Sequence, residues 1–269
     1  MASCPNVTKA YCKNVRQEKP AYFDITIKKN LAIVELNRPP VNAISPYFLN
    51  QLLSSFTALN KDISVRAILI RSSLPTVFSA GADIRELSHL SAKEIRQFVE
   101  AGQNFCDLIE TINQPTIAVI QGHALGGGCE IALSCDLRVA GKKASFGQPE
   151  VHLGLLPAWG GTQRLPQLIG KSRAMDLLLT GKSVAADTAF DIGLVNYLLD
   201  DDKVNSFAED LAVTIGKQSI IATSGIKAAV KATDSSRINK GFDEEINQFV
   251  SCALSPQHKE DVRMFLKEK

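Results

Sequence analysis

A run of three glycines at 126–128 constrains the fold of this chain most, because it joins a buried strand to an apolar helix. The apolar run 115–121 (PTIAVIQ) predicts a strand in a sheet that is buried on both faces. Residues 127–135 then predict a short helix, and residues 136–141 (DLRVAG) predict the next strand. Strand, loop, helix and strand in this order are typical of an α/β protein.

Glycine is an unfavourable helix residue and costs about 0.8–1 kcal/mol relative to alanine, so the run needs a compensating role. A second loop of small residues, Ala80-Gly81-Ala82, opens another helical stretch. In both loops, unpaired N–H groups at a helix start can bind an anion or a developing oxyanion. One such donor contributes about 2.7–4 kcal/mol of transition-state stabilisation. The structural alternative is that the glycines only permit close packing of helix against strand.

Nucleotide-binding loops do not fit the spacing of these glycines. A phosphate loop ends in Gly-Lys-Ser/Thr and requires another glycine about five positions earlier. That earlier position is Leu165 for Gly170-Lys171-Ser172 and Asp176 for Gly181-Lys182-Ser183. The dinucleotide fingerprint requires a glycine at position 131, which is Ile131. We therefore expect neither class of nucleotide loop.

Two glutamates follow the glycine run. Glu130 lies one turn into the predicted helix, before an apolar segment where an ionised carboxylate is costly to bury unless it is paired or functional. Alternatively, it is a first-turn acid that the helix dipole stabilises by about 0.3–1 kcal/mol. Glu150 lies in a segment rich in glycine and proline, SFGQPEVHLGLLPAWGG, where a solvated surface glutamate is the alternative. Neither residue is decisive by itself.

The rest of the N-terminal half predicts further sheet and helix. Residues 22–28 and 31–37 are rich in β-branched residues and predict a hairpin. Ser45 followed by Pro46 predicts the start of a helix. Residues 66–72 predict another buried strand, followed by a small-residue loop and an irregular helical stretch to about residue 112.

The chain divides into a flexible leader over 1–20, an α/β core over 21–202 and a helical region over 203–269. The helical region has too few apolar residues for a core of its own, so we expect it to pack on neighbouring surfaces. Helices are predicted at 172–180, 185–193, 203–216, 219–233, 241–253 and about 258–268.

Composition narrows the class of partner. The 269 residues include 30 basic and 28 acidic side chains without a basic cluster, so we expect no nucleic-acid or membrane partner. The six cysteines form no C-x-x-C pair, which favours reduced thiols and disfavours a metal site. We expect a cytoplasmic protein; the lysines of the leader leave the mitochondrial matrix as the alternative.

Taken together, both loops and both glutamates resemble the crotonase superfamily, in its enoyl-CoA hydratase/isomerase branch. Five segments carry the resemblance over nearly the whole chain, in the family's order: LNRPPVNAI, FSAGADIREL, GHALGGGCEIALSCDLRVA, ASFGQPEVHLGLLPAWGGTQRLPQLIG and LLLTGKSVAADTAFDIGLVN. The resemblance implies a spiral of ββα turns with a helical C-terminal trimerisation region, in a homotrimer or a homohexamer. It also implies an acyl-CoA substrate, so that coenzyme A is part of the substrate and no separate cofactor is expected.

The resemblance also implies roles for single residues. The N–H groups of Ala82 and Gly127 would form the oxyanion hole for the thioester carbonyl. Glu130 would help to activate water, and Glu150 would deliver a proton to C2. Two carboxylates in a partly dry pocket do not both ionise readily, so we expect one of them to titrate abnormally high.

Six further positions are implied in substrate or coenzyme A binding: Ala80, Gly81, Asp83, Ile84, Ala158 and Trp159. The Ala158-Trp159 pair departs from the Gly-Ala or Gly-Gly that hydratases commonly have. The Trp159 ring would narrow the acyl pocket, or it would simply be a core aromatic.

Possession of both glutamates favours hydration of a 2-enoyl-CoA. Alternatives are a specialised hydratase for branched, aromatic-derived or cyclic substrates, an enoyl-CoA isomerase, or an RNA-binding relative that is not an enzyme. The balanced charge argues against RNA.

Overall fold

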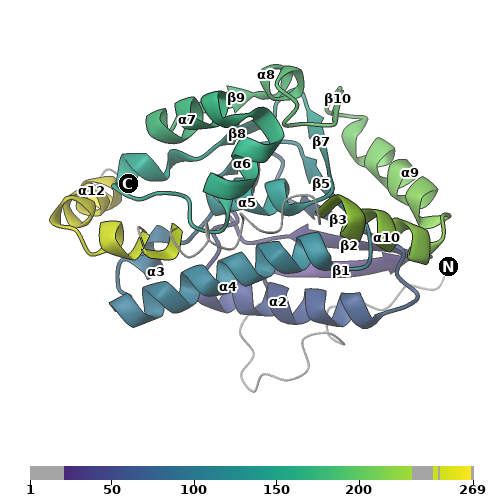
Figure 1. Cartoon of the computed structure of the whole chain (residues 1–269), viewed down its shortest axis with the longest axis horizontal. Coiled ribbons are helices and arrows are strands. Elements are labelled where there is room, and N and C mark those ends of the chain that lie inside the picture. Colours follow the sequence, from purple (N-terminus) through teal and green to yellow (C-terminus); the bar gives the residue numbers. More distant parts are fainter. Residues whose placement is uncertain (1–20, 232–244, 248, 268–269) are drawn as a thin grey trace.

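The computed structural model describes residues 21–231, 245–247 and 249–267, whose ten strands form two sheets (Figure 1). The first sheet has the order β1 (Phe23–Lys28), β2 (Leu31–Leu36), β3 (Ala67–Ser72), β5 (Thr116–Ile120), β7 (Leu137–Gly141) and β10 (Tyr197–Leu199). The second has the order β4 (Val77–Ser79), β6 (His123–Leu125), β8 (Ser145–Gly147) and β9 (Ser183–Ala185). The β1–β2 and β8–β9 pairs are antiparallel, and the other pairs are parallel.

The chain passes repeatedly from the first sheet to the second. β3 is followed by β4, β5 by β6 and β7 by β8, and each pair of strands precedes helical structure. This is the expected spiral of ββα turns. The predicted hairpin and the predicted strands β3, β5 and β7 are confirmed, whereas β10 was not predicted. The three-residue strands β4, β6 and β8 were not expected, because they are too short to show a side-chain period.

Helices cover both faces of the first sheet (Figure 1). Alternate strand residues, such as Ile33 and Leu69, pack under α9 (Val204–Gly216). The intervening residues belong to the main core, with α2 (Pro46–Lys61) and α4 (Ala92–Thr111). Burial on both faces explains the nearly continuous apolar runs of these strands.

Local signals explain several helix boundaries. Ser45 Oγ accepts a hydrogen bond from Phe48 N at 3.2 Å and caps α2, as expected. Helix α5 (Gly127–Ser134) is buried along its whole length, which accounts for its apolar sequence. The remaining helical elements are α3 (Ile84–Leu87), η1 (Pro149–Leu153), α6 (Gly161–Ile169), α7 (Lys171–Thr180), α8 (Ala186–Asp191), α10 (Ile220–Lys231) and α12 (Pro256–Lys267).

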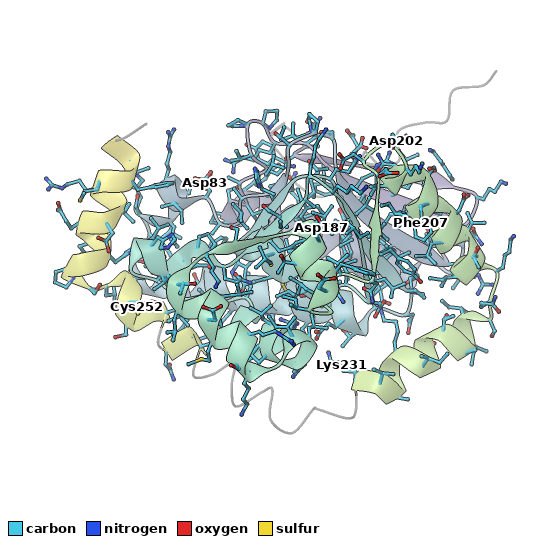
Figure 2. All side chains as sticks on the ribbon, turned by 90° about the horizontal axis from the view of Figure 1, so that it is seen from above. Asp83, Asp187, Asp202, Phe207, Lys231 and Cys252 are labelled. Atoms are coloured by element: carbon cyan, nitrogen blue, oxygen red, sulfur yellow. The ribbon has the colours of Figure 1, made fainter. Side chains whose placement is uncertain are left out.

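The C-terminal helices lie at two separate ends of the molecule. Figure 2 shows Phe207 of α9 at one end and Cys252, in the helical segment before α12, at the other. Helix α12 packs on η1, where His258 Nδ1 donates to Leu153 O at 2.5 Å. The predicted leader over 1–20 and the start of the predicted helix 241–253 lie outside the described residues.

The described ranges contain neither a membrane-spanning helix nor a metal-binding cluster of side chains. None of their helices is both long and apolar enough to span a membrane. The same part of the chain contains no group of three or more histidine, cysteine or acidic side chains placed to hold a metal ion.

Candidate active site

Three parallel strands of the second sheet end at a common edge. β4, β6 and β8 are neighbours in that order, and their carboxyl ends lead to the 80–82 loop, the glycine run and η1. Ligands of α/β proteins commonly bind beyond the carboxyl ends of parallel strands. The spiral therefore brings segments that lie about 45 and 25 residues apart in sequence to one place.

A cavity of about 570 Å³ lies at this edge. Of the ten residues implied by the resemblance, eight line it: Ala80, Ala82, Ile84, Gly127, Glu130, Glu150, Ala158 and Trp159. Apolar residues that were not predicted complete much of the wall, among them Leu87, Phe98, Val99, Leu153, Phe249 and Phe265. The cavity is thus largely apolar, with carboxyl groups at defined points.

Two backbone N–H groups are available at the meeting point of the loops. Ile44 N donates to Gly81 O at 2.7 Å, and Asp83 N donates to Ile44 O at 2.9 Å. The intervening Ala82 N–H points to the other side, because successive groups of an extended backbone alternate. Gly127 is the first residue of α5, so its N–H has no intrahelical acceptor.

The two loops are in direct contact at Gly81. Its φ is +84°, and a Cβ atom there would lie 2.7 Å from Gly127 N. Only glycine adopts this conformation and spacing without strain. Gly81 therefore brings the 80–82 loop against the start of α5.

Asp83, in contrast, does not line the cavity. Its carboxylate caps α3 by accepting from Glu86 N at 3.3 Å, and it forms an ion pair with Arg38 Nη2 at 2.8 Å. Asp83 thus orders the loop that contains Ala82.

Glu130 is buried, with 2% of its surface exposed. Its Oε1 accepts from Trp159 N and from Gly161 N, both at 2.7 Å. Gly161 begins α6, so the carboxylate pairs an N–H that the helix leaves free. The pairing offsets part of the cost of burying the carboxylate.

Glu150 is half-buried in η1 and faces the glycine run. A Cβ atom on Gly126, whose φ is +51°, would lie 2.8 Å from Glu150 Oε1. In the amide orientation that satisfies its hydrogen bonds, Gln148 donates to both oxygens of Glu150, at 3.2 and 3.3 Å. The Glu150 carboxylate is therefore fixed by hydrogen bonds from Gln148 and is not a freely solvated surface acid.

Glu245 was not singled out in the sequence and is a third buried carboxyl, 3% exposed. Its oxygens accept from Gly160 N at 2.9 Å, Thr162 N at 3.2 Å and Gln103 Nε2 at 3.1 Å. The available signal was its place beside Ile246, four residues before Phe249, on a predicted helix. An acid next to the apolar face of a helix needs a partner.

Burial raises the pKa of all three carboxyl groups. For Glu130, burial acts first, repulsion from Glu150 and Glu245 adds to it, and the N–H groups of Gly161 and Trp159 oppose it, which leaves the pKa well above its usual value. For Glu150, burial raises the pKa to about 8. Burial likewise raises the pKa of Glu245, against the opposing effect of its donors. Because these carboxyl groups interact, the titration of each one depends on the protonation of the others.

Trp159 is both a core residue and a cavity wall. It is 3% exposed, and its ring meets that of Phe98 edge to face, with centroids 5.3 Å apart. A Cβ atom on Gly102 or Gly127 would lie within 2.5 Å of the Trp159 ring. The ring therefore fills the space between α4 and the start of α5.

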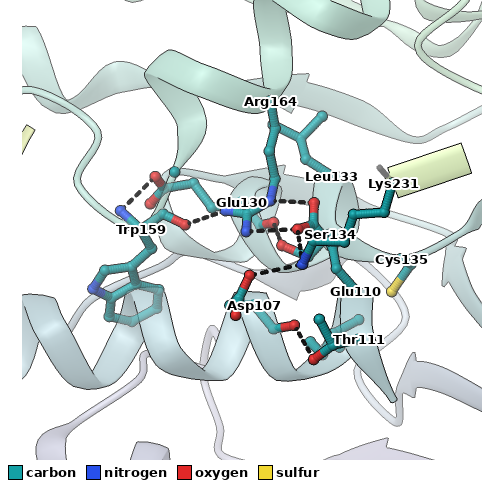
Figure 3. A network of polar contacts seen from close by, with 12 residues as sticks. Asp107, Glu110, Thr111, Glu130, Leu133, Ser134, Cys135, Trp159, Arg164 and Lys231 are labelled. Atoms are coloured by element: carbon teal, nitrogen blue, oxygen red, sulfur yellow. Dashed lines mark hydrogen bonds and ion pairs between the residues drawn. The ribbon is translucent and has the colours of Figure 1, made fainter. Parts of the chain in front are cut away.

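An ionic network contacts the backbone carbonyl of Trp159 (Figure 3). Arg164 Nη1 donates to Trp159 O at 2.8 Å, and Arg164 Nε pairs with Glu110 Oε1 at 2.6 Å. Lys231 of α10 pairs with Asp107 at 2.8 Å and with Glu110 at 3.4 Å. These contacts tie α4, α6 and α10 together behind Glu130.

The thiol of Cys129, beside Glu130, is unreactive. Cys129 is buried and free, and burial raises its pKa, so it stays protonated at neutral pH. It is a core residue, as expected. His152 lines the cavity, with its Nε2 2.9 Å from Thr180 O.

Solved structures share this architecture. The crystal structure of an enoyl-CoA hydratase from Geobacillus kaustophilus HTA426 superposes with a TM-score of 0.79 at 31% identity, over 93% of this chain and 96% of that one. The enoyl-CoA hydratase from Bacillus anthracis gives a TM-score of 0.77 at 28% identity, over 92% and 97% of the two chains.

Sequence comparison gives the same grouping. The crotonyl-CoA hydratase of Syntrophomonas wolfei is 39% identical over 252 residues, which are 93% of this chain and 97% of that protein. The short-chain-enoyl-CoA hydratase of Clostridium acetobutylicum is 34% identical over 240 residues, 89% of this chain and 92% of that protein. The family model for enoyl-CoA hydratase/isomerase matches residues 26–269, and the chain belongs to this family.

Proposed function

We propose that this protein hydrates the 2,3-double bond of a 2-enoyl-CoA thioester and forms a 3-hydroxyacyl-CoA reversibly. One observation carries the proposal: the buried carboxyl group of Glu130 and the half-buried one of Glu150 line the same cavity as Ala82 and Gly127. The hydratases named above are related over nearly the whole chain, which supports the same reaction.

The proposed mechanism follows from where charge develops. Addition of water to an α,β-unsaturated thioester places negative charge on the carbonyl oxygen, and the N–H groups of Ala82 and Gly127 stabilise it. The two N–H donors on Glu130 Oε1 oppose the effect of burial and favour the ionised form of Glu130, which accepts a proton from the attacking water. Glu150, with its pKa raised to about 8, holds a proton at neutral pH and delivers it to C2.

The substrate range that we propose is short to medium acyl chains. The cavity of about 570 Å³ is lined largely by apolar residues, and the bulky ring of Trp159 takes up part of its wall, which favours short chains. The names of the two relatives, a crotonyl-CoA and a short-chain-enoyl-CoA hydratase, agree with this range.

The direct test uses crotonyl-CoA and longer 2-enoyl-CoA substrates. We expect the enoyl-thioester absorbance to disappear and mass spectrometry to show a product heavier by one water. A 3-enoyl-CoA supplied separately tests the isomerase alternative. Absence of hydration across all 2-enoyl chain lengths would contradict the proposal.

We also propose that the subunits associate as trimers or as dimers of trimers. Large apolar side chains are exposed on α10, where Ile221, Ile226 and Val230 are 81%, 63% and 66% exposed. Helix α7 likewise exposes Leu179. Association would cover such surface. Light scattering of the purified protein is expected to give three or six subunits, and a monomer would contradict this assembly.

A further inference from the structure

The turn over residues 159–162 is held between two carboxylates. The N–H groups of Trp159 and Gly161 donate to Glu130, and those of Gly160 and Thr162 donate to Glu245. Successive N–H groups thus point alternately to Glu130, in α5, and to Glu245, in the C-terminal segment that precedes α12.

This turn depends on outside acceptors. Gly160, the residue before α6, has a φ of +103° and has no side chain to cap the helix. The Gly161 and Thr162 N–H groups belong to the first turn of α6, where helices leave N–H groups unpaired. Glu130 and Glu245 take the place of the missing cap. A buried N–H that is left unpaired destabilises the fold.

Glu245 is itself fixed from three directions. Besides the two backbone donors, it accepts from Gln103 Nε2 of α4 at 3.1 Å and from Thr162 Oγ1 at 2.5 Å. Four donors on one carboxylate leave it little freedom to move. Because the turn is rigid on this side, the position of the two N–H groups that hold Glu130 Oε1 is defined.

We propose that Glu245 is a positioning residue for the hydration reaction, which fixes Glu130 through the 159–162 turn and makes the site depend on docking of the C-terminal segment. The proposal rests on the proposed function. Glu245 acts through the backbone, so its loss is expected to lower kcat more than it raises KM. A misplaced catalytic group typically costs on the order of 100-fold in rate.

Charge adds a second effect that can be measured separately. The ionisable groups around the turn are Glu130 from α5, Glu150 from η1, Arg164 from α6 and Glu110 from α4. Negative charge on Glu245 raises the pKa of Glu130 and of Glu150. A neutral side chain at 245 therefore shifts both titrations to lower pH, whereas a shorter carboxylate does not.

The test compares Glu245→Gln with Glu245→Asp, and uses Glu100→Gln on the exposed face of α4 as the charge-matched control. With crotonyl-CoA we expect kcat to fall about 10- to 100-fold in both Glu245 variants, with KM changed less than about threefold. The pH–rate profile moves to lower pH only in Glu245→Gln. Glu100→Gln behaves as the wild type.

Carboxyl titration by ¹³C NMR, with glutamate labelled in the substrate-free protein, gives a readout that does not require turnover. We expect the Glu130 and Glu150 resonances, assigned with Glu130→Gln and Glu150→Gln, to titrate at lower pH in Glu245→Gln. If the wild type fails to hydrate any 2-enoyl-CoA, the proposed reaction is wrong and this titration alone decides the role of Glu245. If Glu245→Gln folds, a wild-type kcat together with an unchanged titration would overturn the inference. If Glu245→Gln does not fold, a wild-type kcat in Glu245→Asp would overturn it.

Discussion

Gly126 leaves the space that the Glu150 carboxylate occupies: a Cβ atom on this glycine would lie 2.8 Å from Glu150 Oε1. Its φ of +51° also lies in the left-handed region, where most side chains are strained. We expect Gly126→Ala to displace Glu150 and to lower kcat for crotonyl-CoA by about 10²-fold or more, since a misplaced acid loses much of its general acid contribution. Steady-state kinetics on the folded variant measures this.

Gly170→Ala is the matched control for Gly126→Ala. Gly170 also has a left-handed φ, +81°, but a Cβ atom there meets nothing within 4 Å. The control should lose about 1 kcal/mol of stability from backbone strain and keep its activity. Equal losses of kcat in the two variants would contradict a specific role for Gly126.

Gly128 has a packing role, which agrees with the structural alternative for this member of the run. A Cβ atom there would lie 2.4 Å from Ser79 O, a backbone atom that cannot swing aside. We expect Gly128→Ala to lower the free energy of unfolding by about 1–3 kcal/mol, because helix α5 must move away from β4. Denaturant unfolding measures the change. A variant as stable as the wild type would show that the helix and strand are not in tight contact.

The raised pKa of Glu150 predicts a basic limb in the activity. Glu150 must be protonated to act as the acid, so kcat/KM is retained below about pH 8 and falls as pH rises through that value. A pH–rate profile with crotonyl-CoA measures this limb. Activity that stays constant to pH 10 would contradict the assignment of Glu150 as the acid.

The same pKa affects stability. Burial raises the pKa of Glu150 from its usual 4.5 to about 8 in the folded chain, so the folded chain binds an extra proton between these values. The free energy of unfolding therefore decreases as pH rises across this window. Denaturant unfolding at pH 5 and pH 8 should show a smaller decrease in Glu150→Gln than in the wild type.

Trp159 is expected to limit the length of the acyl chain. Trp159→Leu keeps the backbone N–H that donates to Glu130 but replaces the indole ring in the cavity wall with a smaller side chain. We expect the ratio of kcat/KM for a ten-carbon 2-enoyl-CoA to that for crotonyl-CoA to rise about tenfold or more. Phe23→Leu, in the core away from the cavity lining, is the control and should reduce stability without changing this ratio. An unchanged ratio in folded Trp159→Leu would show that another residue sets the limit.

The longer strands and helices were predictable because their burial leaves a continuous apolar run or a helical period in the sequence. The apolar runs at 66–72 and 115–121 predict strands covered on both faces, and the structure has β3 and β5 there. Ser45 predicts a helix start, which the structure confirms. The short strands of the second sheet were not predictable. Three residues carry no readable period, and their place is set by neighbouring strands in space.

Helix α6 was missed for a related reason. Its sequence begins with Gly160-Gly161 and contains Pro166, which normally indicate a break. The acceptors that replace its cap come from Glu130 and Glu245, which are 31 and 83 residues from their partners Gly161 and Thr162. Glu130 could be selected as an isolated acid among apolar residues, whereas the partners of Glu245 exist only in the folded chain.

The two-carboxylate mechanism is tested by comparing crotonyl-CoA hydration by the wild type, Glu130→Gln and Glu150→Gln, with the Kd for crotonyl-CoA determined for each. We expect hydration by the wild type and a fall in kcat of about 10²- to 10⁴-fold in each variant, because each removes one proton-transfer group. The Kd should change little, since the variants retain the cavity and the N–H groups of Ala82 and Gly127. Variants that hydrate crotonyl-CoA within about threefold of the wild-type rate would contradict the assignment of these two carboxyl groups.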